Sequence, residues 1–149
     1  MPRFVLLYHD CPANYERPSH WDFMLEREGT LRTWALPELP CDWQAAHART
    51  QKAYPSCPKL APTNDVAAEQ LADHRAAYLD YEGEVSGNRG HVIRVAAGTY
   101  QNEHETPTSW SVCLAGEIVV GHIELTRSTN NDGVWILRCG ASSNHRDKQ

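Results

Sequence analysis

The sequence predicts a mainly β domain of the α+β class, an antiparallel β-barrel or strongly curled sheet with one or two short helices. Two observations carry this expectation. About seven short apolar segments are separated by turn residues, and only the middle of the chain has a helical composition. Many short strands leave exposed edges, which closure into a barrel removes. The 149 residues fit a single domain, which we expect over residues 1–141 with a polar tail over 142–149.

Three strands are predicted in the N-terminal part of the chain. Residues 3–9 form a continuous apolar run, typical of a strand covered on both faces. A proline-containing loop over residues 10–19 follows. In residues 20–26 apolar and polar side chains alternate, so each kind lies on its own face of a strand. Residues 30–36 complete a hairpin with that strand. The polar face of the second strand carries His20, Asp22, Met24 and Glu26.

Short helices are predicted in the middle of the chain. Asp42 is a suitable N-cap for a helix that ends near Thr50. Three prolines make residues 51–64 a loop. An alanine-rich segment then favours a second helix from Val66 to about Leu71.

The C-terminal half is predicted to be β throughout. Glycines interrupt the chain over residues 81–90. Asn130-Asn131-Asp132-Gly133 is a turn signal between the last two strands. The expected strands cover residues 91–97, 109–115, 117–126 and 133–139.

Composition and charge exclude several classes of function. The formal net charge of −5 argues against a general nucleic-acid coat, although not against a small site for one phosphate. No segment reaches the roughly 18 apolar residues of a membrane helix, and the N-terminus lacks the pattern of a secretory signal. The five cysteines form no C-x-x-C pair. We therefore expect reduced thiols, several of them buried, in a cytoplasmic monomer that does not bind membranes.

Eight histidines are many for a chain of this length, and a metal site near the N-terminus could explain two of them, His9 and His20. His20 and Asp22 are two positions apart on a strand, so their side chains point the same way. His9 ends the preceding strand and could complete a three-ligand divalent-metal site with open positions. The alternative interpretation is an ordinary exposed polar face.

A series of motifs spread over most of the chain resembles the 3′-phosphoesterase domain of bacterial DNA ligase D. The family pattern has a His, then His-x-Asp-Phe-Arg-Leu-Glu, then Trp-Ala-x-Pro, then Asp-His followed by Phe-Glu-Gly. The matching segments here are His9, His20-Trp21-Asp22-Phe23, Trp34-Ala35-Leu36-Pro37, Asp73-His74 and Tyr81-Glu82-Gly83.

The resemblance implies a barrel-like fold and a manganese-dependent enzyme, with Zn²⁺ or Co²⁺ as alternative ions. Such a domain removes a terminal ribonucleoside and the remaining 3′-phosphate from the 3′ end of DNA or a primer-template. It would serve non-homologous end joining in a bacterium, with any ligase or polymerase on a separate chain. The family's metal ligands correspond to His9, His20 and Asp22, and its phosphate-contacting catalytic residues to His74 and Tyr78.

This chain departs from the family pattern at several phosphate or catalytic positions. Met24 replaces the arginine of the His-x-Asp-Phe-Arg motif and Glu38 replaces a lysine, so two cations are lost. Val66 and Ala72 replace an arginine and a glutamate, and the segment between the first two ligands is longer. Replacement guanidinium groups could come from Arg32, Arg75, Arg89 or Arg94.

Three functions therefore remain open. The first is a metal-dependent phosphoesterase whose phosphomonoesterase step is the weaker, since a dianion needs more positive charge. The second is a catalytically weakened or inactive metal- and phosphate-binding module of an end-joining system. The third is an altered substrate such as a small phosphodiester. We expect Trp21 and Trp34 to belong to the core, whereas His91 and His122 could reach the site.

Overall fold

A computed structural model describes residues 1–50, 60–129 and 133–140. The proposed turn at 130–132, most of the loop at 51–64 and the expected tail lie outside the described residues. Within the described part, the strands are β1 (Arg3–Asp10), β2 (His20–Arg27), β3 (Thr30–Leu36), β4 (Asp65–Arg75), β5 (Gly83–Glu84), β6 (His91–Thr106), β7 (Ser109–Gly116), β8 (Gly121–Arg127) and β9 (Val134–Cys139).

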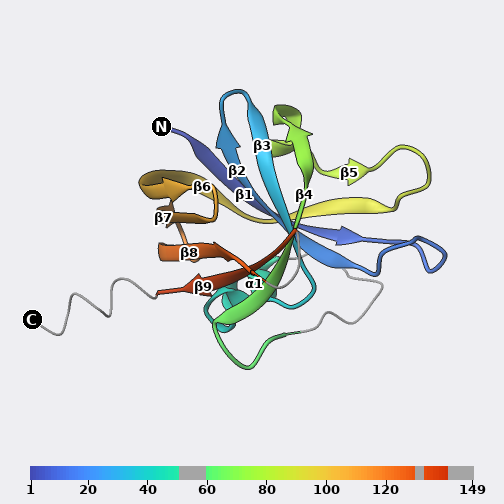
Figure 1. Ribbon diagram of the computed structural model, residues 1–149. Helices are drawn as coiled ribbons and strands as arrows, with labels where there is room; N and C mark the ends of the chain where they lie inside the picture. The colour runs from blue at the N-terminus through green and yellow to red at the C-terminus, as the bar shows by residue number, and fades with distance from the viewer. Residues whose placement is uncertain (51–59, 130–132, 141–149) are drawn as a thin grey trace, which may run out of the picture.

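Eight of these strands close into an antiparallel barrel in the order β1-β2-β3-β4-β9-β8-β7-β6 (Figure 1). The pairing of β6 with β1 completes the ring, and the short β5 is added beside β6. The barrel predicted from the sequence is confirmed. Closure leaves none of these eight strands as an unpaired edge along its full length.

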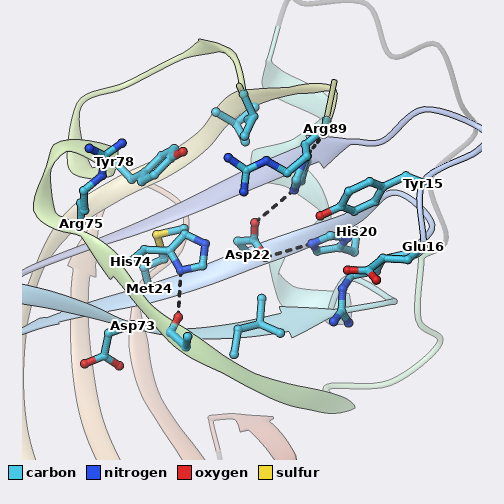
Figure 2. A pocket seen from close by; sticks show the side chains of 16 residues that line it. Tyr15, Glu16, His20, Asp22, Met24, Asp73, His74, Arg75, Tyr78 and Arg89 are labelled. Atoms are coloured by element: carbon cyan, nitrogen blue, oxygen red, sulfur yellow. Dashed lines mark hydrogen bonds and ion pairs between the residues drawn. The ribbon is translucent and has the colours of Figure 1, made fainter. Parts of the chain in front are cut away.

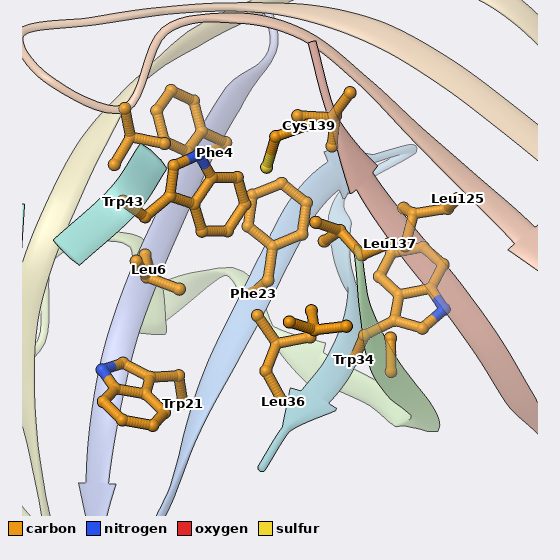
Figure 3. Close-up of a cluster of buried hydrophobic side chains, with 14 of the residues drawn as sticks. Phe4, Leu6, Trp21, Phe23, Trp34, Leu36, Trp43, Leu125, Leu137 and Cys139 are labelled. Carbon is orange, nitrogen blue, oxygen red and sulfur yellow. The ribbon is translucent and has the colours of Figure 1, made fainter. Parts of the chain in front are cut away.

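The barrel interior holds the main hydrophobic core (Figure 3). Trp21, Phe23 and Leu25 point inward from β2, as the alternation in the sequence predicts. Trp34 packs edge-on against Trp110 and Trp135, with ring centroids 6.0 and 5.7 Å apart. Trp21 and Trp34 are each only 1% exposed, which confirms that both belong to the core.

A second, smaller hydrophobic cluster lies outside the barrel wall. Val5, Leu7 and Met24 project from the outer faces of β1 and β2. The 3₁₀ helix η2 (Ala76–Leu79) and the segment around β5 cover them through Leu79 and Val85. The continuous apolar run in β1 is explained by burial on both faces.

Of the two helices predicted from the sequence, the first is confirmed and the second is wrong. The first helix exists as the 3₁₀ turn η1 (Cys41–Trp43) followed by α1 (Gln44–Arg49), although Asp42 makes no capping hydrogen bond. The expected helix from Val66 to Leu71 is wrong, because these residues belong to β4. Val66 and Ala68 alternate with exposed residues and face the core, so pairing with β3 and β9 outweighs the helical preference of alanine.

The remaining differences concern strand ends. β6 continues to Thr106, well beyond the expected end at residue 97, and β8 begins only at Gly121. No helix among the described residues is long and apolar enough to cross a membrane.

Candidate metal centre

Two adjacent strands bring together the three residues that the sequence indicates as metal ligands. His9 is the penultimate residue of β1, and His20 begins β2 directly opposite it in the antiparallel register. Asp22 follows two positions later on the same face. All three lie on the outer wall of the barrel, and they are 9%, 4% and 3% exposed.

The ligand atoms converge on the Asp22 carboxylate. His20 Nε2 lies 3.0 Å from one carboxylate oxygen, and His9 Nδ1 lies 3.7 Å from the other (Figure 2). These separations match roughly the 3–3.5 Å between neighbouring ligands of an ion held at about 2.1 Å. Asp22 Oδ1 is fully buried and, among the described residues, accepts no well-aligned hydrogen bond beyond this ion-pair contact with His20.

Backbone carbonyls fix the orientation of both imidazoles. His9 Nε2–H donates to the Arg89 carbonyl at 2.6 Å, and His20 Nδ1–H donates to the Pro18 carbonyl at 2.8 Å. The other nitrogen of each ring therefore faces Asp22. Second-shell contacts of this kind set the tautomer of metal-binding histidines. Two imidazole nitrogens and a carboxylate oxygen thus meet at one point, a donor set that fits a divalent cation.

A glycine allows the close approach that positions His9. Gly90 has a φ of +88°, and a Cβ at this residue would collide with the Asp10 carbonyl oxygen. The turn that carries Arg89 can therefore lie directly over the end of β1.

The charge of Asp22 depends on the two histidines. Burial alone would raise the pKa of this carboxyl group, but contacts with His20 and His9 hold its pKa far below the usual range. Burial alone would lower the pKa of His20. The hydrogen bond and the charge of Asp22 outweigh burial, so the pKa of His20 is raised above its ordinary value. The cluster consequently carries an ionised carboxylate at neutral pH.

Cys11 offers a second possible donor to the same histidines. One donor atom each of His9, Cys11 and His20 lies within 4.8 Å of the others. The thiol is on the Nδ1 side of His20, which the Pro18 carbonyl already occupies. Burial, together with Asp22, raises the pKa of Cys11 to about 11, so the thiol is neutral. The set that includes Asp22 is therefore the better cation site.

A cavity of about 410 Å³ opens beside the three ligands. His74 and Tyr78 line it, with ring centroids 5.6 Å apart in an edge-to-face contact. They do not share one helix, because His74 lies near the end of β4 and Tyr78 belongs to the 3₁₀ helix η2. His74 Nδ1–H donates to the Ala72 carbonyl at 3.0 Å, which directs Nε2 to the other side of the ring (Figure 2).

The candidate phosphate-binding arginines divide into two groups. Arg75 and Arg89 line the cavity. Arg32 is not brought to this cavity, because it pairs with Asp73 at 3.5 Å and lines a different hollow. Arg94 donates to the Leu79 carbonyl and also lies outside the cavity.

Sequence reasoning missed three cavity residues in the loop between β1 and β2. Tyr15, Glu16 and Arg17 line the cavity, and Arg17 pairs with Glu69 at 2.5 Å. The extra length of this loop was the available signal, but a loop without periodicity does not show where its side chains point.

The structure also shows where the substituted family positions and the other histidines lie. Met24 and Ala72 line the cavity, whereas Val66 lies in the barrel core, away from it. His91 lies 3.8 Å from Asp10 without lining the cavity. His122 is on β8, across the barrel from β2, so the expectation that it reaches the site is wrong.

Comparison with known proteins shows the family of the chain. Residues 9–127 match the model of the DNA ligase D 3′-phosphoesterase domain. The chain belongs to this family. The matched segment contains all three candidate ligands together with His74 and Tyr78.

The curated relatives of this phosphoesterase-family chain are much longer proteins. The multifunctional non-homologous end joining protein LigD of Pseudomonas aeruginosa is 35% identical over 83 residues, 56% of this chain and 7% of its own length. The protein of the same name from Mycobacterium bovis is 30% identical over 141 residues, 89% of this chain and 15% of its own length. A Mycobacterium tuberculosis LigD shows the same identity and coverage. The chain therefore spans only a small fraction of these relatives.

Proposed function

We propose that the protein is a metal-dependent phosphoesterase that processes nucleic-acid 3′ ends during non-homologous end joining. It removes a 3′-terminal ribonucleoside, a 3′-phosphate, or both. One observation carries the proposal: two fixed imidazoles and a buried carboxylate oxygen converge beside a cavity that also holds His74 and Tyr78. Family membership and the relatives' names support the choice of substrate.

His9, His20 and Asp22 would hold the ion, for which Mn²⁺ is the first choice and Zn²⁺ or Co²⁺ are alternatives. A bound divalent ion supplies positive charge to the phosphoryl oxygens and lowers the pKa of a bound water. The protein's part is to hold the three ligands. The Arg89 and Pro18 carbonyls do so by fixing both imidazole rings.

The other cavity residues bind and protonate the phosphate group. His74 presents Nε2 to the cavity and can donate a proton to a phosphate or leaving-group oxygen. The Tyr78 hydroxyl can donate to the charge that develops on the phosphoryl group. Arg75 and Arg89 provide guanidinium groups at the rim.

The direct test is an assay of 3′-end processing with purified protein and Mn²⁺. The substrates are primer-templates ending in a ribonucleotide or in a 3′-phosphate. We expect the wild type to shorten or dephosphorylate them and Asp22→Asn to be inactive. His74→Ala should lose about 10²–10⁴-fold in rate, as expected for a general acid.

His104→Ala is the matched control, because His104 is exposed and lies outside the cavity. This variant should keep full activity. Wild-type protein that leaves both primers intact, or that matches Asp22→Asn in rate, would contradict the proposal.

A binding module without turnover is the second candidate, and one observation favours it. Met24 lines the cavity with an apolar thioether where the family has an arginine. Saturable binding of Mn²⁺ and oligonucleotide without product would indicate this function. Activity only on small phosphodiesters in a substrate panel would indicate the third function.

A further inference from the structure

His122 is a partly buried histidine that the proposed phosphoesterase site does not use. It lies on β8, and Cys113 on β7 is directly opposite it in the antiparallel register. Glu103 lies on β6, within the irregular pairing between Asn102 and His104. Figure 1 shows these three strands side by side. Three residues on consecutive strands thus form one cluster.

The side chains of this cluster project from the outer face of the barrel. In β7 and β8 the neighbouring residues Val112 and Ile123 point into the core. Cys113 and His122 therefore point outward. Four strand-to-strand steps separate β8 from β2 in either direction around the ring. The cluster is thus on the wall opposite the candidate metal centre.

The geometry of the cluster is that of converging donors. His122 Nδ1 lies 2.7 Å from Glu103 Oε2. One donor atom from each of Glu103, Cys113 and His122 lies within 4.8 Å of the other two. Neighbouring ligands of a zinc ion are roughly 3–4 Å apart, so small side-chain rotations would close the set around an ion. The side chains of His122 and Glu103 are 14% and 30% exposed, which leaves one side open to water.

We propose that Glu103, Cys113 and His122 form a second metal site, which binds a zinc-class divalent transition-metal ion. A thiolate, an imidazole and a carboxylate are the three kinds of ligand that zinc takes in proteins. Water would fill the open fourth position. Each ligand belongs to a different strand, so a bound ion links β6, β7 and β8.

The donor set also distinguishes this ion from that of the phosphoesterase centre. Thiolate ligands favour zinc and other softer ions, whereas manganese and magnesium prefer oxygen donors. Mn²⁺ is therefore expected to occupy His9, His20 and Asp22 without competing for the cluster on β6–β8. The proposal does not depend on the phosphoesterase function.

Cobalt provides the test, because Co²⁺ substitutes for zinc and absorbs light strongly only when a thiolate is bound to it. Reduced full-length protein is titrated with Co²⁺ and then with Zn²⁺. We expect a thiolate-to-cobalt charge-transfer band in the near ultraviolet that Zn²⁺ abolishes and excess Mg²⁺ leaves unchanged. Cys113→Ser should lose the band. His122→Ala should bind Co²⁺ more than about 100-fold more weakly, since outer-shell partners alone contribute 10–100-fold.

Cysteine variants elsewhere are the controls. Cys11→Ser tests the thiol beside His9 and His20, and Cys139→Ser tests a buried thiol. Both variants, and Asp22→Asn, should retain the band. Glu103→Gln, on a partly exposed side chain, should weaken Co²⁺ binding even if Cys113→Ser fails to fold. Absence of the band in the wild type, its persistence in Cys113→Ser, or its loss in Cys11→Ser would overturn the proposal.

Discussion

Met24 is the single residue that most separates this chain from the family pattern. Its side chain is 1% exposed, and it belongs to the outer hydrophobic cluster while also lining the cavity. A guanidinium at this position would point toward the same hollow as Asp22. This chain therefore has an apolar thioether that packs in the outer cluster at the position where the resemblance implies a guanidinium.

Met24→Arg should increase the rate of 3′-phosphate removal by tenfold or more, because it returns a cation to the cavity. It should also lower the free energy of unfolding by about 1–3 kcal/mol, since a longer charged side chain must fit a packed cluster. Steady-state kinetics and urea denaturation measure the two effects. Met24→Leu is the control and should change neither; a rate increase with Met24→Leu would show that the added charge is not the cause.

Cys139 gives a prediction about reactivity and pH. Burial raises the pKa of this thiol to about 12, above the ordinary value of 9.0. The folded protein therefore keeps the thiol neutral, and the stability it contributes is lost as the pH rises from about 9 to 12. At pH 8, among the four cysteines that the structure describes, iodoacetamide should modify the exposed Cys41 first and Cys139 last, as followed by peptide mass spectrometry. Equal labelling rates would contradict this order.

At the scale of elements, β6 is the strand that closes the barrel. It pairs with both β1 and β7, and Gly98 sits where the two pairings meet. A Cβ added at Gly98 would overlap the Ala115 carbonyl oxygen and lie 2.8 Å from Phe4 Cε2. Closure of the barrel at β6 thus requires a glycine at position 98, because a larger residue would not fit.

Gly98→Ala should destabilise the protein by about 1–3 kcal/mol, the usual cost of overpacking a core. Urea denaturation measures the loss. Gly121→Ala is a useful comparison, because its φ of +94° strains an alanine while nothing lies within 4 Å of the new Cβ. If Gly98→Ala is no more destabilising than Gly121→Ala, the close packing of β6 against β7 and Phe4 does not determine the loss of stability.

The elements also show what sequence patterns can predict. Alternation in β2 is enough to place His20 and Asp22 on one face, because a strand has a period of two. In β4 burial alternates over residues 65–69, but the sequence Val66-Ala67-Ala68 shows no such alternation and favours a helix, so only pairing with β3 and β9 decides the outcome. The sequence alone could not show that Arg17 lines the cavity, because a loop has no regular period from which the direction of a side chain can be predicted.

At the scale of the whole molecule, the proposed metal centre is coupled to folding, because the three residues that would hold the ion come together only in the barrel. His9 and His20 belong to different strands, and Arg89 reaches His9 from a turn 80 residues away in the sequence. The unfolded chain has no such arrangement. An ion that binds the folded state alone must stabilise it.

Mn²⁺ at 100 times its dissociation constant should therefore add about 2.7 kcal/mol to the free energy of unfolding. The melting temperature should rise by about 5–10 °C for a chain of this size, as measured by thermal unfolding with Mn²⁺ and with EDTA. His20→Ala should show no such rise. An equal rise in His20→Ala would place the stabilising ion elsewhere.

The hydrogen bond that His9 donates to residue 89 is accepted by a main-chain carbonyl, which any amino acid at that position provides. The Arg89 side chain, in contrast, faces the cavity. One position thus serves two independent purposes, and substitution alters only one of them. A substitution at residue 89 changes the charge that lines the cavity and still leaves a carbonyl for His9 to bind. This separates the evolution of substrate preference from that of metal affinity.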